Sequence, residues 1–307
     1  MTKITIIGAG FVGATAAQRI AEEELGNLVI MDIIEGMPQG KALDLMESAP
    51  IMGYDANVLG TNNYEDIKDS DIVVITAGIA RKPGMSREDL VKINSNIIAD
   101  VCDNIKKYAP DSVVIIVTNP LDLMTYIAMK QTGFPPQRVF GMSGVLDCGR
   151  FAAFISMELN CSAKDVDAMV LGGHGDSMVP LTRFTTVSGI PITELIETKT
   201  IDQLVQRTIN GGAEIVELLK TGSAFYAPSA AITNMVRSIV LDQNRILPAC
   251  AFLTGQYGFD SIYLGVPVKL GRSGIEQIIE LELTKTEQDA LNRSAESVKQ
   301  GILTLDI

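Results

Sequence analysis

The stretch Ile4-Thr5-Ile6-Ile7-Gly8-Ala9-Gly10-Phe11-Val12-Gly13 decides the fold. It begins as a short β-branched run, contains three glycines, and leads into an apolar-periodic segment that extends to about residue 24. A strand, a tight glycine turn and a helix N-terminus in this order are typical of a dinucleotide-binding unit, because glycines let the backbone approach a pyrophosphate and the helix end offers unpaired N–H groups. We therefore predict that a dinucleotide contacts Gly8, Ala9, Gly10, Phe11, Val12 and Gly13.

An acidic residue at the end of the next strand pattern indicates which dinucleotide binds. Asp32 closes the apolar run at residues 28–31 and lies 19 residues beyond Gly13. A carboxylate in this place accepts hydrogen bonds from the adenosine ribose and repels a 2′-phosphate. The neighbours Ile33 and Ile34 bring no positive charge that would receive such a phosphate. The sequence predicts NAD rather than NADP, against the alternative that Asp32 only caps a loop.

The first half of the chain alternates strand and helix patterns. Val/Ile-rich runs at residues 72–77 and 113–118 flank a long helical segment at 87–108, and weaker signals mark a helix at 40–47 and a strand at 56–60. Such alternation is typical of a parallel sheet covered on both faces. We predict an α/β protein with an N-terminal Rossmann domain, a doubly wound parallel sheet, in residues 1–143.

The second half shows a different pattern. Short strand patterns occur at residues 165–171, 177–179 and 187–188, helical patterns at 201–220 and 230–241, and antiparallel strand patterns between 249 and 270. A last helix is expected to begin with a capping box at Thr284 or Thr286. We predict a C-terminal α+β catalytic domain in residues 144–307.

The composition argues against several classes of partner. The net charge of −12 would repel nucleic acid and anionic membranes, and no apolar run reaches the ~18 residues that span a bilayer. Four scattered cysteines and a single histidine do not fit a disulfide framework or a structural metal site. The N-terminus shows no secretion signal. We expect a cytoplasmic protein without a metal.

The single histidine, His174, lies in a Gly-Gly-His-Gly-Asp loop directly after an apolar run. The glycines leave room around the ring, and the pKa of imidazole suits proton exchange near neutral pH. Upstream, Asp147 and Arg150 are three residues apart in an apolar segment, so on a helix they would share a buried face and need specific partners. The alternatives are a structural histidine and an ordinary surface ion pair.

Two further stretches follow strand patterns and are expected at the carboxyl edge of the sheet, where such folds bind ligands. Residues 78–88 contain two glycines, a proline, and the arginines Arg81 and Arg87, and could close over a substrate as a lid. Residues 117–120, Val-Thr-Asn-Pro, would place the amide of Asn119 at the same edge. Each stretch alone is also compatible with an ordinary loop.

Five stretches carry a resemblance: the glycine turn with Asp32, residues 78–88, residues 117–120, the segment with Asp147 and Arg150, and the loop of His174. In this order and spacing they resemble the lactate/malate dehydrogenase family across nearly the whole chain. The resemblance implies that His174 transfers a proton while a hydride moves between substrate and NAD, and that Asp147 orients the histidine. It also implies that Arg150 binds a substrate carboxylate, that Arg87 polarises the reacting carbonyl, and that Asn119 binds beside it. Further cofactor contacts are implied for Asn94, Val117, Thr118 and Asn119.

Arg81 would decide the substrate. In the family this lid position faces the far end of the substrate, where an arginine suits a second carboxylate and an uncharged residue suits pyruvate. Burying Arg81 unpaired against a methyl group would cost several kcal/mol, on the order of 10³-fold in discrimination. Small residues within 226–231 also leave room for the longer acid. We expect a small dicarboxylate, malate or oxaloacetate.

Other functions stay open. A lactate dehydrogenase is disfavoured by Arg81, and an NAD-dependent glycosidase of related fold would need a metal held by cysteine and histidine. A non-catalytic dinucleotide-binding protein would be expected to have lost Asp147, Arg150 or His174. The resemblance implies a homo-oligomer, a homotetramer with a homodimer as the alternative. One departure is Gly149, where the family more often has alanine, at a cost of ~1 kcal/mol of helix stability.

Overall fold

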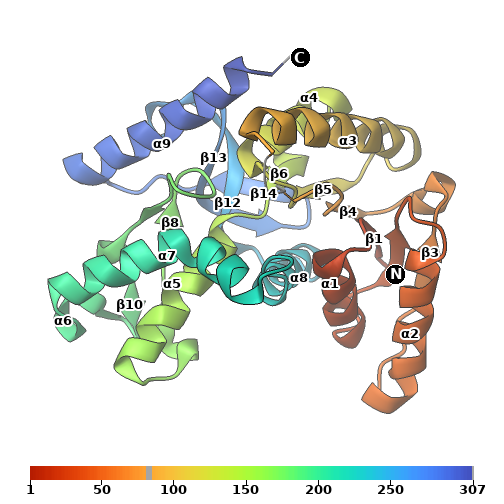
Figure 1. The fold of residues 1–307 in the computed structure, drawn as a ribbon, viewed down its shortest axis with the longest axis horizontal. Coiled ribbons are helices and arrows are strands. Elements are labelled where there is room, and N and C mark those ends of the chain that lie inside the picture. Colours follow the sequence, from red (N-terminus) through yellow and green to blue (C-terminus); the bar gives the residue numbers. More distant parts are fainter. Residues whose placement is uncertain (81–84, 306–307) are drawn as a thin grey trace.

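The computed structural model describes residues 1–80 and 85–305. Within these residues, nine strands form one sheet in the order β14-β13-β12-β6-β5-β4-β1-β2-β3 (Figure 1). The part from β3 to β6 is parallel, which confirms the predicted α/β class, and the part from β12 to β14 is antiparallel. The strands are β1 Lys3–Ile7, β2 Asn27–Met31, β3 Val58–Thr61, β4 Ile72–Ile75, β5 Val113–Ile116, β6 Val139–Gly141, β12 Arg245–Thr254, β13 Asp260–Gly271 and β14 Gly274–Ile278.

Helices cover both faces of the parallel part, because successive strand residues point to opposite sides of a sheet. Ile6 and Val74 belong to the core of one face, and their neighbours Ile7 and Val73 belong to the core of the other. The first face is covered by α1 Phe11–Glu22, α2 Met37–Met52 and α8 Tyr226–Val240, and the second by α3 Arg87–Tyr108 and α4 Leu121–Thr132.

The strand order reverses between β1 and β4, which are neighbours in the sheet. At such a switch point the connections leave in opposite directions, and a crevice remains at the carboxyl ends of the strands. The glycine turn follows β1, Asp32 follows β2, and residues 117–119 follow β5. The fold therefore gathers the predicted cofactor residues at one edge of the sheet.

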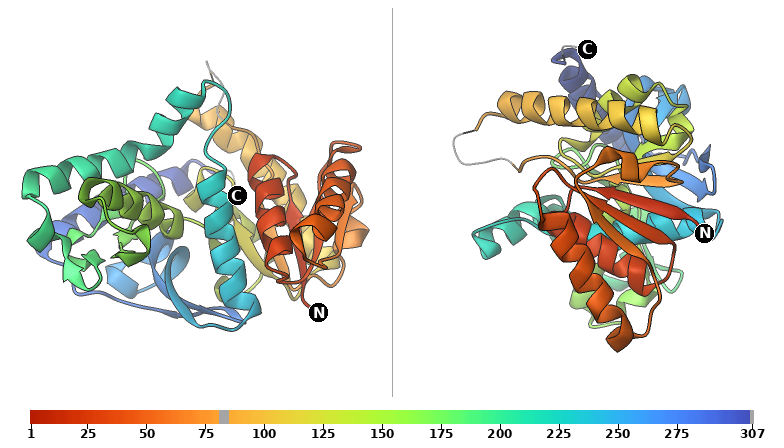
Figure 2. Two further views of the ribbon diagram at one scale, coloured as in Figure 1. Left: turned by 90° about the horizontal axis from the view of Figure 1, so that it is seen from below. Right: turned by 90° about the vertical axis from the view of Figure 1, so that its right-hand side faces the viewer.

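The second half continues the same sheet and adds a smaller lobe. β12 joins β6 through the pair Cys250 and Gly141, so the proposed division at residues 143/144 separates strands of one sheet and stays a prediction. The lobe has its own core around Phe151 and Ile192 and lies beside the sheet (Figure 2). Its elements are α5 Gly144–Leu159, β7 Val166–Asp167, β8 Val170–Leu171, β9 Val179–Pro180, β10 Thr186–Val187, β11 Ile190–Pro191, α6 Ile192–Leu195 and α7 Thr198–Leu219.

The last helix, α9 Lys285–Leu303, begins with the predicted capping box, formed by Thr284 and Glu287. None of the described helices has an apolar stretch long enough to cross a membrane. Short 3₁₀ turns complete the chain at η1 Tyr64–Ile67, η2 Pro136–Arg138, η3 Ala163–Asp165, η4 Thr182–Phe184 and η5 Gln256–Gly258.

Several elements were not predicted from the sequence pattern, among them α4, β6, β11, α6 and β14. α4 buries polar as well as apolar side chains, including Asp122 and Thr125, so it lacks the one-sided apolar stripe of a surface helix. β6 has only three residues, too few for a recognisable alternation. In addition, α2 extends from Met37 to Met52, well beyond the predicted residues 40–47.

Replacing Gly149 by alanine should stabilise the protein. Gly149 is exposed within α5, and a Cβ added there meets no atom within 4 Å. Gly149→Ala should therefore raise the free energy of unfolding by about 1 kcal/mol, measured by urea denaturation. Gly144→Ala in the same helix is the matched control, because its Cβ would lie 2.5 Å from Pro248 and should destabilise the fold. A loss of stability in Gly149→Ala would contradict the prediction.

Candidate functional site

The glycine turn after β1 is closed on one side and open on the other. Gly8 has a φ of 110°, and a Cβ on it would lie 2.6 Å from the Ala77 nitrogen. A Cβ on Gly13 would lie 2.0 Å from the Gly8 carbonyl oxygen. These two glycines are required by the close approach of β1, α1 and β4. A Cβ on Gly10, in contrast, meets no protein atom within 4 Å, so the space beside the N-terminus of α1 can receive phosphates.

Asp32 is hydrogen-bonded to this turn. Its Oδ2 accepts from the N–H of Ala9 at 2.6 Å, and its Oδ1 accepts from the N–H of Ile34 at 3.0 Å. The carboxylate is thereby fixed at the end of β2, with lone pairs left for ribose hydroxyls. Lys41 of α2 donates to the carbonyl oxygen of Ala9, a contact that sequence reasoning missed because a lysine within a helical pattern gives no local signal.

The second half of the chain contacts the start of α1. The ring of Phe11 stacks on Phe225, with ring centroids 5.3 Å apart, and Phe225 lies against Tyr226 at 4.2 Å. Val12, by contrast, is partly buried and packs against the core. The sequence singled out Phe11 only for its place in the turn, since no local pattern reveals a partner from the segment before α8.

Asn94 joins the loop after β4 to the loop after β5. It is fully buried in α3, and its Oδ1 accepts from the N–H of Ile79 at 2.9 Å. Its Nδ2 donates to the carbonyl oxygens of Ile79 at 3.1 Å and Asn119 at 2.7 Å. Thr118 similarly donates its hydroxyl to the backbone after β4. These bonds position the loops after β4 and β5, and direct cofactor contacts of Asn94, Val117 and Thr118 stay predictions.

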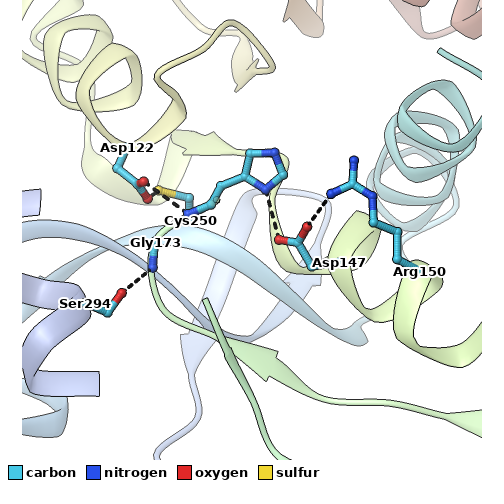
Figure 3. Close-up of polar contacts among 7 residues, drawn as sticks. Asp122, Asp147, Arg150, Gly173, Cys250 and Ser294 are labelled. Carbon is cyan, nitrogen blue, oxygen red and sulfur yellow. Dashed lines mark hydrogen bonds and ion pairs between the residues drawn. The ribbon is translucent and has the colours of Figure 1, made fainter. Parts of the chain in front are cut away.

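The structure brings His174, Asp147 and Arg150 into one chain of contacts (Figure 3). Nδ1 of His174 lies 2.9 Å from Oδ2 of Asp147, and Nη1 of Arg150 donates to Oδ1 of Asp147 at 3.2 Å. Asp147 and Arg150 share a face of α5, whereas His174 comes from the loop after β8. The Asp147 side chain is buried, and its two oxygens serve two basic groups.

The surroundings of His174 raise its proton affinity. Burial lowers the pKa of the imidazole, but the charge of Asp147 and its hydrogen bond act in the other direction and leave the pKa above its ordinary value. Arg150 opposes this effect. Because Asp147 accepts from Nδ1, the nitrogen that can exchange a proton with a ligand is Nε2.

Arg150 has an unused hydrogen-bond donor. Its Nε is buried and has no hydrogen-bond partner among the described residues. The side chain packs on α7, where a Cβ on Gly211 would lie 3.2 Å from its Cδ and one on Gly212 would lie 3.6 Å from Nη2. A buried guanidinium with unused N–H groups is suited to a carboxylate ligand. The contact of these glycines with Arg150 was not predicted, because their only local signal is a Gly-Gly pair within a helical pattern.

Two arginines of the predicted lid cannot be placed in this arrangement. Arg81 lies outside the described residues, and so does the side chain of Arg87, whose backbone begins α3. The start of α3 is fixed by a capping box between Ser86 and Asp89. The roles of both arginines stay predictions. In the part of the chain that is described, no cluster of three or more His, Cys, Asp or Glu side chains could hold a metal.

Comparisons with known proteins show what this chain is similar to. The family models for the lactate/malate dehydrogenase NAD binding domain and alpha/beta C-terminal domain match residues 2–141 and 144–305. A malate dehydrogenase of Methanosarcina mazei is 64% identical over all 307 residues, with both chains fully covered. The apo malate dehydrogenase of Picrophilus torridus is 47% identical with a TM-score of 0.96, covering 98% of this chain and 96% of that one. A Cryptosporidium parvum lactate dehydrogenase complexed with lactic acid and NAD is 41% identical with a TM-score of 0.96, covering 99% and 98%.

Replacing Asp147 by asparagine should lower the pKa of His174. A neutral amide cannot stabilise the imidazolium as a carboxylate does. Burial and the charge of Arg150, which both lower the pKa of His174, would then no longer be opposed by Asp147. Because the chain has one histidine, NMR titration of the imidazole in tag-free protein reports this pKa without ambiguity. Asp176→Asn is the control, since that carboxylate is exposed and screened by water. An unchanged titration in Asp147→Asn would show that the contact does not set the proton affinity.

Proposed function

The chain belongs to the lactate/malate dehydrogenase family, and we propose that it catalyses the reversible NAD-dependent oxidation of (S)-malate to oxaloacetate. The observation that carries this function is the buried contact between His174, Asp147 and Arg150, which places a proton acceptor beside a cation with free donors. Relatives named malate dehydrogenase that are 55% to 64% identical over nearly the full chain support the same substrate.

The residues present fit NAD. The open side of Gly10 would receive the pyrophosphate at the N-terminus of α1, and Asp32 would accept hydrogen bonds from the adenosine ribose. Ile33 and Ile34 are exposed beside Asp32 and offer no cation to a 2′-phosphate. When bound, NAD supplies the hydride acceptor of the reaction, and NADH supplies the donor in reverse.

His174 moves the proton in both directions. During malate oxidation, neutral His174 takes the hydroxyl proton at Nε2 as the C2–H bond gives up its hydride, and a C=O bond forms. During oxaloacetate reduction, the imidazolium returns the proton to the carbonyl oxygen. Asp147 stabilises the charged ring that exists between these steps. Oxidation should therefore speed up as pH rises through the pKa of His174, and reduction should slow down.

The arginines bind and polarise the substrate. Arg150 would hold the carboxylate next to the reacting carbon through donors that Asp147 does not use. Arg87 would polarise the carbonyl from the start of α3, and Asn119 would donate to the substrate from the loop after β5. Arg81 would bind the second carboxylate, which distinguishes malate from lactate.

We also propose that the protein is a homo-oligomer, a homotetramer with a homodimer as the alternative, and that it works in the cytoplasm. Support for association comes from apolar side chains left exposed on α2, including Leu43, Ile51 and Met52. Such side chains are covered when subunits associate. Light scattering coupled to size-exclusion chromatography measures the subunit number, and a monomer at micromolar concentration would overturn the proposal.

Substrate preference should follow the charge of Arg81. With NADH, kcat/KM for oxaloacetate should exceed that for pyruvate by about a hundredfold or more, because pyruvate would leave the guanidinium of Arg81 without a partner carboxylate. Arg81→Gln should lower the rate with oxaloacetate and shift the preference toward pyruvate. Lys82→Gln, which removes a neighbouring positive charge, is the matched control and should leave the ratio unchanged. A wild-type enzyme equally fast with both acids would refute the role of Arg81.

Replacing His174 by asparagine should abolish proton transfer and spare cofactor binding. We expect kcat to fall by about 10²–10⁴-fold, the range that a positioned acid–base group contributes. NADH affinity, measured by fluorescence titration, should stay near the wild-type value, because the glycine turn and Asp32 belong to another part of the crevice. Retained turnover would remove His174 from its proposed role.

A further inference from the structure

A second carboxylate lies behind the histidine loop. Asp122 is the second residue of α4 and is almost completely buried. Its Oδ2 accepts from the backbone N–H of His174 at 3.2 Å, and its Oδ1 lies 3.3 Å from the Sγ of Cys250 on β12 (Figure 3). Three elements far apart in the chain therefore meet at one carboxylate, which neither the sequence analysis nor the proposed reaction uses.

The backbone of the histidine loop is held at three successive amides. The N–H of Gly172 donates to Gly265 of β13 at 2.9 Å, and the N–H of Gly173 donates to Ser294 of α9 at 2.8 Å. The N–H of His174 donates to Asp122. Of these acceptors only Asp122 is ionisable, and it holds the residue whose ring transfers the proton.

Burying a carboxylate is costly unless donors surround it. Burial raises the pKa of Asp122 to about 6, and the hydrogen bonds from Cys250 and His174 work against that rise. Above this pH the group is negatively charged, and its charge adds to that of Asp147 in raising the pKa of His174. Such a costly group at a proton-transfer site indicates a role beyond filling space.

We propose that Asp122 is a positioning residue for the proton donor: its carboxylate fixes the backbone of His174, and Cys250 fixes the orientation of the carboxylate. His174 is then held at two places. Asp147 contacts its ring at Nδ1, and Asp122 accepts from its backbone N–H. The inference rests on the proposed function, because it concerns the geometry of the same proton transfer.

The charged and titratable groups around His174 and Asp122 come from α4, α5, β12 and β13. His174 faces Asp147 and Arg150 of α5 and Asp122 of α4. Asp122 faces Cys250 of β12, and Cys250 in turn lies near Tyr263 of β13. Burial raises the pKa of Cys250 and of Tyr263, so both stay neutral at physiological pH. Asp122 is therefore the group behind the loop whose charge changes in the working range.

Two variants separate the hydrogen bond from the charge. Asp122→Asn can keep its oxygen on the N–H of His174 while it removes the charge, although its NH2 group cannot accept the hydrogen bond that the thiol of Cys250 donates to Asp122. Asp122→Ala removes both and leaves the His174 amide unpaired. Thr132→Ala is the control, a buried hydroxyl ~15 Å farther along α4 that bonds within the helix.

The experiment combines steady-state kinetics with NMR titration of the single imidazole in tag-free protein. We expect Asp122→Ala to lower kcat by about 10²-fold, as a misplaced catalytic group does, with the KM for NADH unchanged. Asp122→Asn should keep most of the kcat that Asp122→Ala loses, and it should shift the His174 titration to lower pH. Thr132→Ala should lower the stability of the protein and leave kcat and the His174 titration unchanged. If Asp122→Ala fails to fold, Asp122→Asn still tests the charge through the titration.

The possible outcomes distinguish this proposal from the proposed function. Wild-type kcat and an unmoved histidine titration in both Asp122 variants would overturn the positioning role while malate dehydrogenase activity stood. Loss of stability without a change in kcat would do the same. Absence of oxaloacetate turnover in the wild type would overturn the function, and the imidazole titration would still report whether Asp122 acts on His174.

Discussion

The site depends on one buried carboxylate, that of Asp147, which accepts from His174 on one oxygen and from Arg150 on the other. Without its negative charge, α5 and the loop after β8 would bring two basic groups together where little water can screen them. With it, the imidazole gains proton affinity and the guanidinium keeps donors for a ligand. A group able to transfer a proton and a cation able to bind an anion thus lie side by side, and the carboxylate of Asp147 between them reduces their repulsion.

One sheet supports both the predicted cofactor residues and the histidine loop. Its parallel part places the glycine turn and Asp32 at the carboxyl edge beside the switch point. Its antiparallel part begins where β12 pairs with β6, and β13 then holds the histidine loop through Gly265. A single sheet therefore supports both the predicted cofactor residues and the histidine loop, which favours a fixed distance between these two groups.

Charge is distributed unevenly over this protein. The chain carries a net charge of −12, yet its proposed substrate is a dianion. Attraction must then be local, and Arg150 is suited to supply it because it is mostly buried, where an ion pair is stronger than in water. Asp147 and Asp122 balance the positive charge of arginine and imidazolium, so the site can hold a proton without becoming a strongly cationic pocket.

The sequence by itself determined the features that depend on neighbouring residues. The turn at residues 8–13, the limits of α3 and the cap of α9 follow from local periodicity and backbone geometry, and the family resemblance paired Asp147 with His174. Tertiary structure alone decided that Asp122 meets Cys250, 128 residues away, and that glycines of α7 lie on Arg150. These contacts depend on strand order and on the packing of α4, α5 and α7, and a local pattern carries no information about which distant segment will share a buried surface.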